Sequence, residues 1–130
     1  FEVHACTDIT GFGILGHSLE MARGGKVAIE MFYESLPFYP NALQMYQKGE
    51  TTGSNEANRQ LANGFWQAAG PLSHEEEALL FDPQTSGGLL LAVPADQCDQ
   101  LLADLKEAGI EAAAHVGDVV EGQGPFVKVV

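Results

Sequence analysis

An acidic residue and a glycine-rich run lie together near the start of the chain, and their types suit the binding of a phosphorylated ligand. Asp8 and Thr10 precede the run Gly11-Phe12-Gly13-Ile14-Leu15-Gly16, which enters a helical pattern. The first N–H groups of a helix are unpaired and attract anions, and glycine lets such a backbone approach a ligand closely. Mg²⁺ favours one or two carboxylates together with phosphate oxygens. Asp8 is therefore a candidate magnesium ligand. In the alternative interpretation, Asp8 or Thr10 only caps the helix, and the glycines permit close packing.

A second group of small polar residues lies immediately before an apolar run. It reads Asp82-Pro83-Gln84-Thr85-Ser86-Gly87-Gly88. Hydroxyl groups and backbone N–H groups in succession can surround an anion, which makes this segment a second candidate site. An ordinary tight turn that feeds a strand explains the same residues equally well.

The first glycine-rich run also matches the G-x-G-x-x-G pattern of dinucleotide-binding folds, and Glu30 lies near where a ribose-binding acid would belong. Two features argue against this interpretation. The segment Thr7–Thr10 separates the strand from the first glycine, and the Asp8 carboxylate would repel a pyrophosphate unless a cation lay between them. The interpretation predicts that this chain alone binds NAD.

Composition narrows the function classes. The 130 residues suffice for one domain, and the formal net charge of −12 disfavours nucleic-acid binding. No apolar run reaches the roughly 18 residues that a membrane span needs, and we expect no membrane association. Cys6 and Cys98 lie far apart, which fits a reducing, cytoplasmic location. Because the chain opens with Phe1 directly into structured-looking sequence, we also expect it to be part of a longer protein.

The elements that must position these residues follow from hydrophobic periodicity and from glycine and proline. We predict one α/β (α+β) domain, a mixed sheet layered with helices that ends in a β-α-β-β unit. Apolar runs predict strands at Glu2–Cys6, Val27–Met31, Gly88–Val93, Ala112–Val120 and Phe126–Val130. The third should be buried on both faces, and the last two should form a hairpin across Gly122–Pro125. Helical patterns cover Phe12–Gly24, Pro40–Gly49, Ser73–Asp82 and Pro94–Gly109, whereas Glu50–Gln60 should be an exposed loop with some helical content near its end.

At this point the two polar segments become recognisable as family motifs. The string from His4 to His17, H-A-C-T-D-I-T-G-F-G-I-L-G-H, resembles a signature of selenophosphate synthetases (selenide, water dikinases). The string from Asp82 to Leu90, D-P-Q-T-S-G-G-L-L, resembles their second C-terminal motif. Shorter parts of both recur in related ATP-using enzymes, namely aminoimidazole ribonucleotide synthetase, thiamine monophosphate kinase and the hydrogenase maturation protein HypE. The resemblance spans the whole chain.

The resemblance implies that residues 1–130 are the C-terminal domain of a selenophosphate synthetase, which packs against an N-terminal ATP-binding and dimerisation domain. The family reaction turns ATP, selenide and water into selenophosphate, AMP and phosphate with Mg²⁺, and the full-length protein should be a homodimer. By this resemblance Asp8 is the metal ligand, and Thr10, Gly11 and Gly13 form the adjoining nucleotide-cleft loop. Residues Thr85, Ser86, Gly87 and Gly88 would line the cleft between the domains.

The resemblance also implies that this chain alone is inactive. The reactive cysteine or selenocysteine of the family and its partner lysine belong to the N-terminal part, so we expect no catalytic residue here. Cys6 and Cys98 should be structural, and His4 and His17 should serve packing and hydrogen bonding. Two alternatives stay open: a domain of one of the related ATP-using enzymes, and a non-catalytic binding or dimerisation module.

Overall fold

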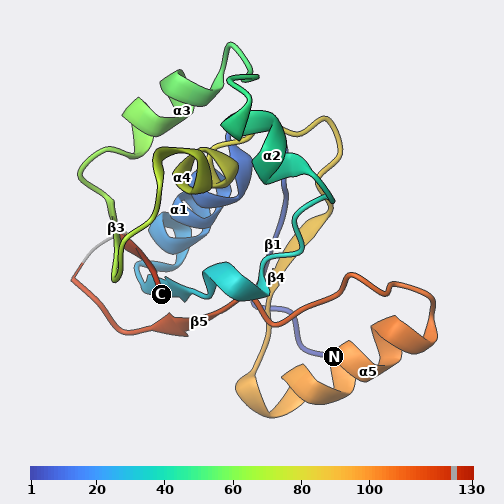
Figure 1. Cartoon of the computed structure of the whole chain (residues 1–130). Coiled ribbons are helices and arrows are strands. Elements are labelled where there is room, and N and C mark those ends of the chain that lie inside the picture. The colour runs from blue at the N-terminus through green and yellow to red at the C-terminus, as the bar shows by residue number, and fades with distance from the viewer. Residues whose placement is uncertain (124–125) are drawn as a thin grey trace.

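Two separate sheets organise the chain in the computed structural model, which describes residues 1–123 and 126–130 (Figure 1). Strand β1 (Ala5–Asp8) pairs antiparallel with β4 (Leu89–Ala92) in a two-stranded ribbon. The second sheet has the order β3-β6-β2-β5. Its strands are β3 (Trp66–Ala68), β6 (Phe126–Val129), β2 (Ala28–Met31) and β5 (Gly117–Val120). A mixed sheet layered with helices confirms the predicted fold class.

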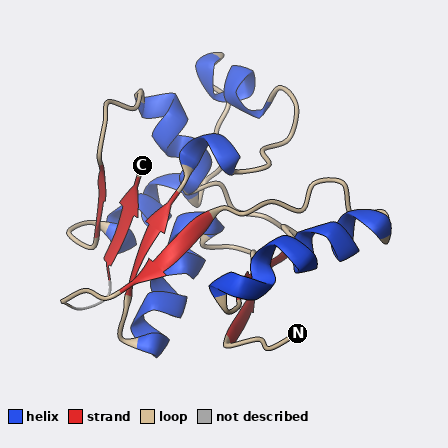
Figure 2. Cartoon of the chain, turned by 90° about the horizontal axis from the view of Figure 1, so that it is seen from below, coloured by secondary structure: helices blue, strands red, loops and turns tan. Residues whose placement is uncertain are grey.

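Helix α1 (Gly13–Gly25) packs against the four-stranded sheet and forms the centre of the core. The sequence pattern places Phe12, Leu15, Leu19 and Ala22 on one helical face; the last three are buried, whereas Phe12, just before the helix, is 43% exposed. They belong to one apolar cluster with buried residues of β2 and β6. Figure 2 shows the sheet with helices on one side of it. Helix α1 ends at a left-handed residue, but this residue is Lys26 (φ 54°), just after the two glycines expected to stop it.

The predicted hairpin between the last two strands is wrong. Strand β2 lies between them: β5 pairs with it antiparallel and β6 pairs with it parallel. Burial explains the arrangement, because Val127 and Val129 of β6 are almost fully buried and require a central strand. Val119 of β5 is 53% exposed, as suits an edge strand. Residues Gly124 and Pro125 of the expected turn lie outside the described residues.

Strand β4 is also different from the prediction. It was expected to be buried on both faces, yet Leu89 is 68% exposed and the other three residues are only partly buried. A continuous apolar run is typical of a central parallel strand. Here the run instead forms one half of a two-stranded ribbon, and sheet membership could not be read from its composition.

The polar stretch after α2 (Ala42–Gln47) contains more structure than expected. Helix α3 (Asn55–Ala62) begins inside the predicted loop Glu50–Gln60, and Asn55 and Asn58 are buried there. Strand β3 follows α3 and was not predicted. The start of α4 (His74–Leu80) is confirmed, because the Ser73 hydroxyl accepts a 3.0 Å hydrogen bond from the Glu76 backbone N–H. The segments η1 (Tyr33–Ser35) and η2 (Ala95–Gln97) are short 3₁₀ helices.

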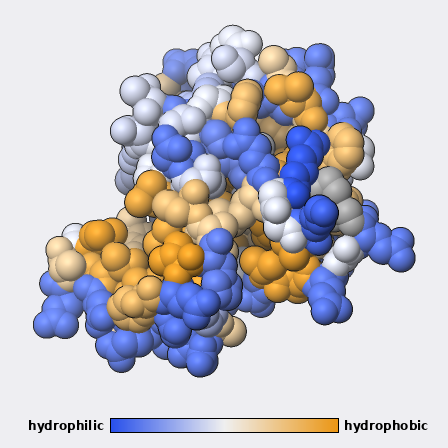
Figure 3. Space-filling view, turned by 180° about the vertical axis from the view of Figure 1, so that it is seen from behind, coloured by the Kyte–Doolittle hydropathy of each residue, from blue (hydrophilic) through white to orange (hydrophobic). Residues whose placement is uncertain are grey.

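Helix α5 (Cys98–Glu107) stands apart from the other helices, beside the N-terminal end of the ribbon (Figure 1). None of its residues is buried, although Leu101, Leu102 and Leu105 are partly covered. Seen from behind, apolar side chains gather on this lobe and on the neighbouring surface (Figure 3). None of the described helices has both the length and the apolar character that crossing a bilayer would require.

Candidate functional site

The ribbon brings the two predicted motifs side by side. Asp8 lies opposite Leu89 in the β1–β4 register. Beyond the strands, the Ile9 N–H donates to the Gly88 carbonyl at 2.8 Å, and the Gly87 N–H donates to the Ile9 carbonyl at 2.9 Å. The two segments are almost eighty residues apart in the sequence, yet their backbones are locked together by hydrogen bonds.

Between the two segments lies an open pocket of about 170 Å³. It is lined by Asp8, Ile9, Thr10, Thr85, Ser86, Gly87, Gly88 and Leu89. The pocket thus contains six of the eight residues that the sequence singled out, and it offers one carboxylate, three hydroxyl groups and backbone groups. Gly11 and Gly13 do not line it.

Glycine is required at the junction because the two backbones approach too closely for a side chain. A Cβ atom on Gly87 would lie 2.6 Å from the Ile9 carbonyl oxygen, well inside van der Waals contact. Gly88 has a φ of +87°, in the left-handed region that favours glycine. These two glycines therefore shape the pocket wall.

Gly13 lies outside this pocket and packs closely at the start of α1. It is buried with a φ of +74°, and a Cβ there would lie 2.8 Å from the carbonyl carbon of Phe81. This close packing of the α1 start against the end of α4 is the alternative that the sequence left open. Gly11 is tied to the same place, because Asn58 Nδ2 donates to the Gly11 carbonyl at 2.7 Å and to the Phe81 carbonyl at 3.0 Å.

Behind the pocket, Thr10 is connected to α1 through a histidine. Thr10 Oγ1 lies 3.2 Å from Nε2 of His17, and Nδ1 of His17 lies 3.0 Å from Oε2 of Glu20. His17 is only 6% exposed, so its ring has little access to solvent. The expected hydrogen-bonding role of His17 is confirmed. His4 differs: it is exposed and its ring contacts only the Glu2 carboxylate among the hydrogen bonds of the described residues.

A polar network holds the start of the second motif. The Asp82 carboxylate accepts hydrogen bonds from the Tyr46 hydroxyl and from the Gln84 side-chain amide. Asn55 Nδ2 donates to the Tyr46 hydroxyl oxygen at 2.9 Å. Burial, followed by the hydrogen bond to Asp82, raises the pKa of Tyr46 well above its usual range, so this hydroxyl stays protonated as a donor. Sequence reasoning missed Tyr46, Asn55 and Asn58; the only available signal was two asparagines three residues apart on one helical face.

The pocket fits a magnesium ion in part. The Asp8 carboxylate is exposed and takes part in no hydrogen bond or ion pair among the described residues. Its neighbours in the pocket offer oxygen ligands, which Mg²⁺ prefers. No group of three or more His, Cys, Asp or Glu side chains converges anywhere in the described residues. One carboxylate is compatible with a magnesium site whose other ligands come from elsewhere.

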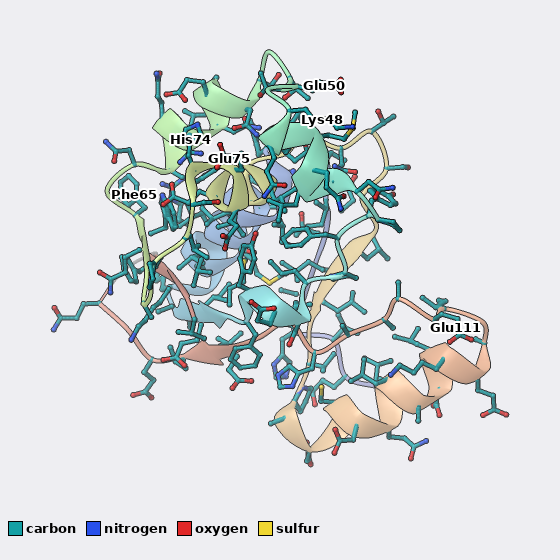
Figure 4. The ribbon with its side chains drawn as sticks, viewed as in Figure 1. Lys48, Glu50, Phe65, His74, Glu75 and Glu111 are labelled. Carbon is teal, nitrogen blue, oxygen red and sulfur yellow. The ribbon has the colours of Figure 1, made fainter. Side chains whose placement is uncertain are left out.

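A larger pocket of about 400 Å³ lies between α3, α4 and β3, away from both motifs. Arg59 occupies its wall, where the guanidinium pairs with Glu77 and lies 5.1 Å from the centre of the Phe81 ring. These contacts tie α3 to α4. The other acidic side chains are scattered, and Glu50, Glu75 and Glu111 project from separate elements (Figure 4).

The cysteines give no second site. Cys98 is half-buried, as a structural thiol would be, whereas Cys6 is exposed on β1. The dinucleotide-binding interpretation is also excluded by topology. That fold needs consecutive parallel strands in one sheet, but here β1 belongs to the ribbon and β2 to the four-stranded sheet.

Comparison with known proteins agrees with the motifs. The profile of the family described as AIR synthase related protein, C-terminal domain, matches residues 1–130. The chain is 47% identical over 121 residues to a selenide, water dikinase of Pelobacter propionicus, covering 93% of this chain and 35% of that protein. It is 41% identical to one from Burkholderia orbicola over 92% of this chain and 34% of that protein. It is 36% identical to one from Clostridioides difficile, covering 99% of this chain and 37% of that protein. The chain therefore spans about a third of the length of these relatives.

Proposed function

This chain belongs to the family of AIR synthase related protein C-terminal domains, and on that basis we propose that it is the C-terminal part of an enzyme that makes selenophosphate. The reaction would convert ATP, selenide and water into selenophosphate, AMP and phosphate. Support comes from relatives named selenide, water dikinase that are 36–47% identical over most of this chain.

One observation carries the proposed role: two distant motifs meet in a pocket that holds a free carboxylate, hydroxyl groups and glycine backbone. Phosphoryl transfer is catalysed largely by positioning and by neutralising charge, which requires such groups more than a nucleophile. Asp8 would hold a magnesium ion together with ligands from outside this chain. Bound there, the metal would neutralise phosphate charge. Thr10, Thr85 and Ser86 would line the cleft, with Gly87 and Gly88 keeping its backbone wall open.

The test is the substitution Asp8→Asn in the full-length protein that contains this chain, assayed by selenide-dependent AMP formation. The amide keeps the size of the side chain but removes its charge, so we expect turnover to fall at least about 100-fold, as for other lost electrostatic stabilisers. Asp99→Asn on exposed α5 is the control and should leave turnover unchanged. Turnover of Asp8→Asn close to that of the wild type would contradict the metal role.

We further propose that this domain acts with an N-terminal domain of the same protein, in a cytoplasmic homodimer, and has no turnover by itself. The pocket supports the pairing with another domain, since Asp8 is the one carboxylate among the residues that line it, and a second domain could add a further carboxylate to a magnesium site. AMP formation by the purified chain alone would contradict the proposal.

The runner-up is a related ATP-using enzyme with the same fold, because the shorter motif elements resemble those of thiamine monophosphate kinase and the hydrogenase maturation protein. The wild-type protein separates the candidates: ATP consumption that depends on selenide supports a dikinase, whereas consumption that depends on thiamine monophosphate supports the kinase. A non-catalytic module would consume ATP in neither assay.

A further inference from the structure

Three side chains form a continuous hydrogen-bonded chain from the surface to the pocket wall. Glu20 is half-exposed on α1, His17 is buried one turn earlier, and Thr10 lines the pocket. The distances are 3.0 Å from Glu20 Oε2 to His17 Nδ1 and 3.2 Å from His17 Nε2 to Thr10 Oγ1. Each ring nitrogen of His17 therefore has one partner.

With a neutral His17 ring and an ionised Glu20, the chemistry of the three groups fixes the direction of these hydrogen bonds. An ionised carboxylate only accepts, so the contact with Glu20 requires a proton on Nδ1 of His17. In the neutral ring, Nε2 is then an acceptor, and its hydrogen-bond partner among the described residues is the Thr10 hydroxyl, which must donate. The Thr10 hydroxyl therefore donates its proton to His17 Nε2. Its oxygen lone pairs remain available as hydrogen-bond acceptors toward the pocket.

The backbone of Thr10 is held by two hydrogen bonds. Its carbonyl oxygen accepts from the Gly13 N–H at 3.1 Å and from the Gln84 N–H at 3.0 Å, which joins the start of α1 to the second motif. The contact with His17 then holds the Thr10 hydroxyl group in place.

We propose that His17, held by Glu20, is a positioning residue that makes Thr10 a hydrogen-bond acceptor toward the pocket. This inference rests on the proposed function and refines it. Thr10 then faces a cation or a donor such as a metal-bound water, and it does not donate to a phosphate oxygen. The pocket wall is divided accordingly: the acceptors Asp8 and Thr10 lie on one segment, and the hydroxyl groups of Thr85 and Ser86 lie on the other.

The first test reads the proton positions directly and needs no turnover. In the full-length protein labelled with ¹⁵N-histidine, long-range proton–nitrogen correlations distinguish the two neutral ring forms, and the His17 signals are those missing from His17→Phe. We expect the Nδ1–H form, which is the less common form of a free imidazole. In Glu20→Ala the signal should change to the Nε2–H form. An Nε2–H or doubly protonated ring in the wild type, or no change in Glu20→Ala, would overturn the proposal. Because no activity is measured, this result is independent of the proposed reaction.

The second test asks whether His17 acts through Thr10. We expect His17→Phe to lower kcat/KM for selenide-dependent AMP formation about tenfold, within the range that coupled neighbours show. The same loss should persist in a Thr10→Ser background, where the hydroxyl is kept, and should vanish in a Thr10→Val background. Ser18→Ala, a buried hydroxyl on the same helix that bonds only the Ile14 carbonyl among the described residues, is the control and should change kcat/KM less than about twofold.

A purely structural His17 would give an equal loss in all three Thr10 backgrounds, and that result would overturn the proposal. If the wild-type protein formed no AMP in response to selenide, the proposed function would be contradicted, and the measurement of the His17 ring form would still stand.

Discussion

The Gly87 N–H donates a 2.9 Å hydrogen bond to the Ile9 carbonyl, and no side chain fits between the two residues. This contact joins the segment that carries the free carboxylate to the segment that carries the hydroxyl groups. The pocket therefore depends on a backbone junction as much as on the side chains that line it.

Replacing Gly87 tests this junction. In Gly87→Ala the new Cβ would meet the Ile9 carbonyl oxygen at 2.6 Å, so the strands must separate, and we expect a loss of about 1–3 kcal/mol in the free energy of unfolding. Urea unfolding of the purified chain, followed by the fluorescence of Trp66, would measure it. Gly53→Ala is the matched control, because nothing lies within 4 Å of its Cβ position. Equal midpoints for the two variants would show that the junction tolerates a side chain.

The second prediction concerns Asn58, whose amide joins the Gly11 and Phe81 carbonyls at 2.7 and 3.0 Å. Truncation in Asn58→Ala leaves both acceptors without this donor, and we expect a cost of about 1–3 kcal/mol in the same unfolding experiment. Asn58→Asp should be at least as damaging, since a carboxylate cannot donate. Asn63→Ala, at an exposed position after the same helix, should change the free energy by less than about 0.5 kcal/mol. A mild effect of Asn58→Ala would mean that water replaces its amide.

The third prediction is a loss of stability at high pH. Burial, helped by the charges of Glu76 and Glu34, raises the pKa of Tyr33 from 10.0 to about 12. Between these two values the folded protein keeps a proton that the unfolded chain releases. The contribution of protonated Tyr33 to the free energy of unfolding is therefore complete below pH 10 and is lost as the pH rises toward about 12. Tyr46 acts in the same direction.

The measurement for this prediction is the urea midpoint between pH 9 and about 11. Tyr33→Phe removes the ionisable group, and with it the hydrogen bond that Tyr33 donates to the Glu76 carbonyl at 2.9 Å, so its midpoint should be lower near neutral pH but fall less steeply. Parallel curves for the wild type and the variant would refute the assignment to Tyr33.

Local signals predicted much of this fold. The helical spacing identified Leu15, Leu19 and Ala22 of the buried face of α1, though it also included the exposed Phe12, and Ser73 with Glu76 marked the start of α4. Such features depend on neighbours within one or two turns, which a single sequence contains. The polar residues of both motifs also proved to share one pocket.

Pairing between strands was the part that could not be predicted. The order of β2, β5 and β6 depends on contacts between residues about a hundred positions apart, and the hairpin predicted from proximity was wrong. The burial of Asn55 and Asn58 could not be predicted for a related reason. Their partners include the carbonyl groups of Ala78 in α4, of Phe81 just after it and of Gly11, and nothing in a polar segment indicates which distant backbone it will satisfy.

The central place of β6 sets an order for events during synthesis. Strand β3 pairs only with β6 among the described strands, and β6 also fills the space beside β2 with the buried Val127 and Val129. A ribosome makes β6 after every other strand of this sheet. Until those residues emerge, the nascent chain has a gap between β3 and β2 and an uncovered face of α1, where chaperones could bind or aggregation could begin.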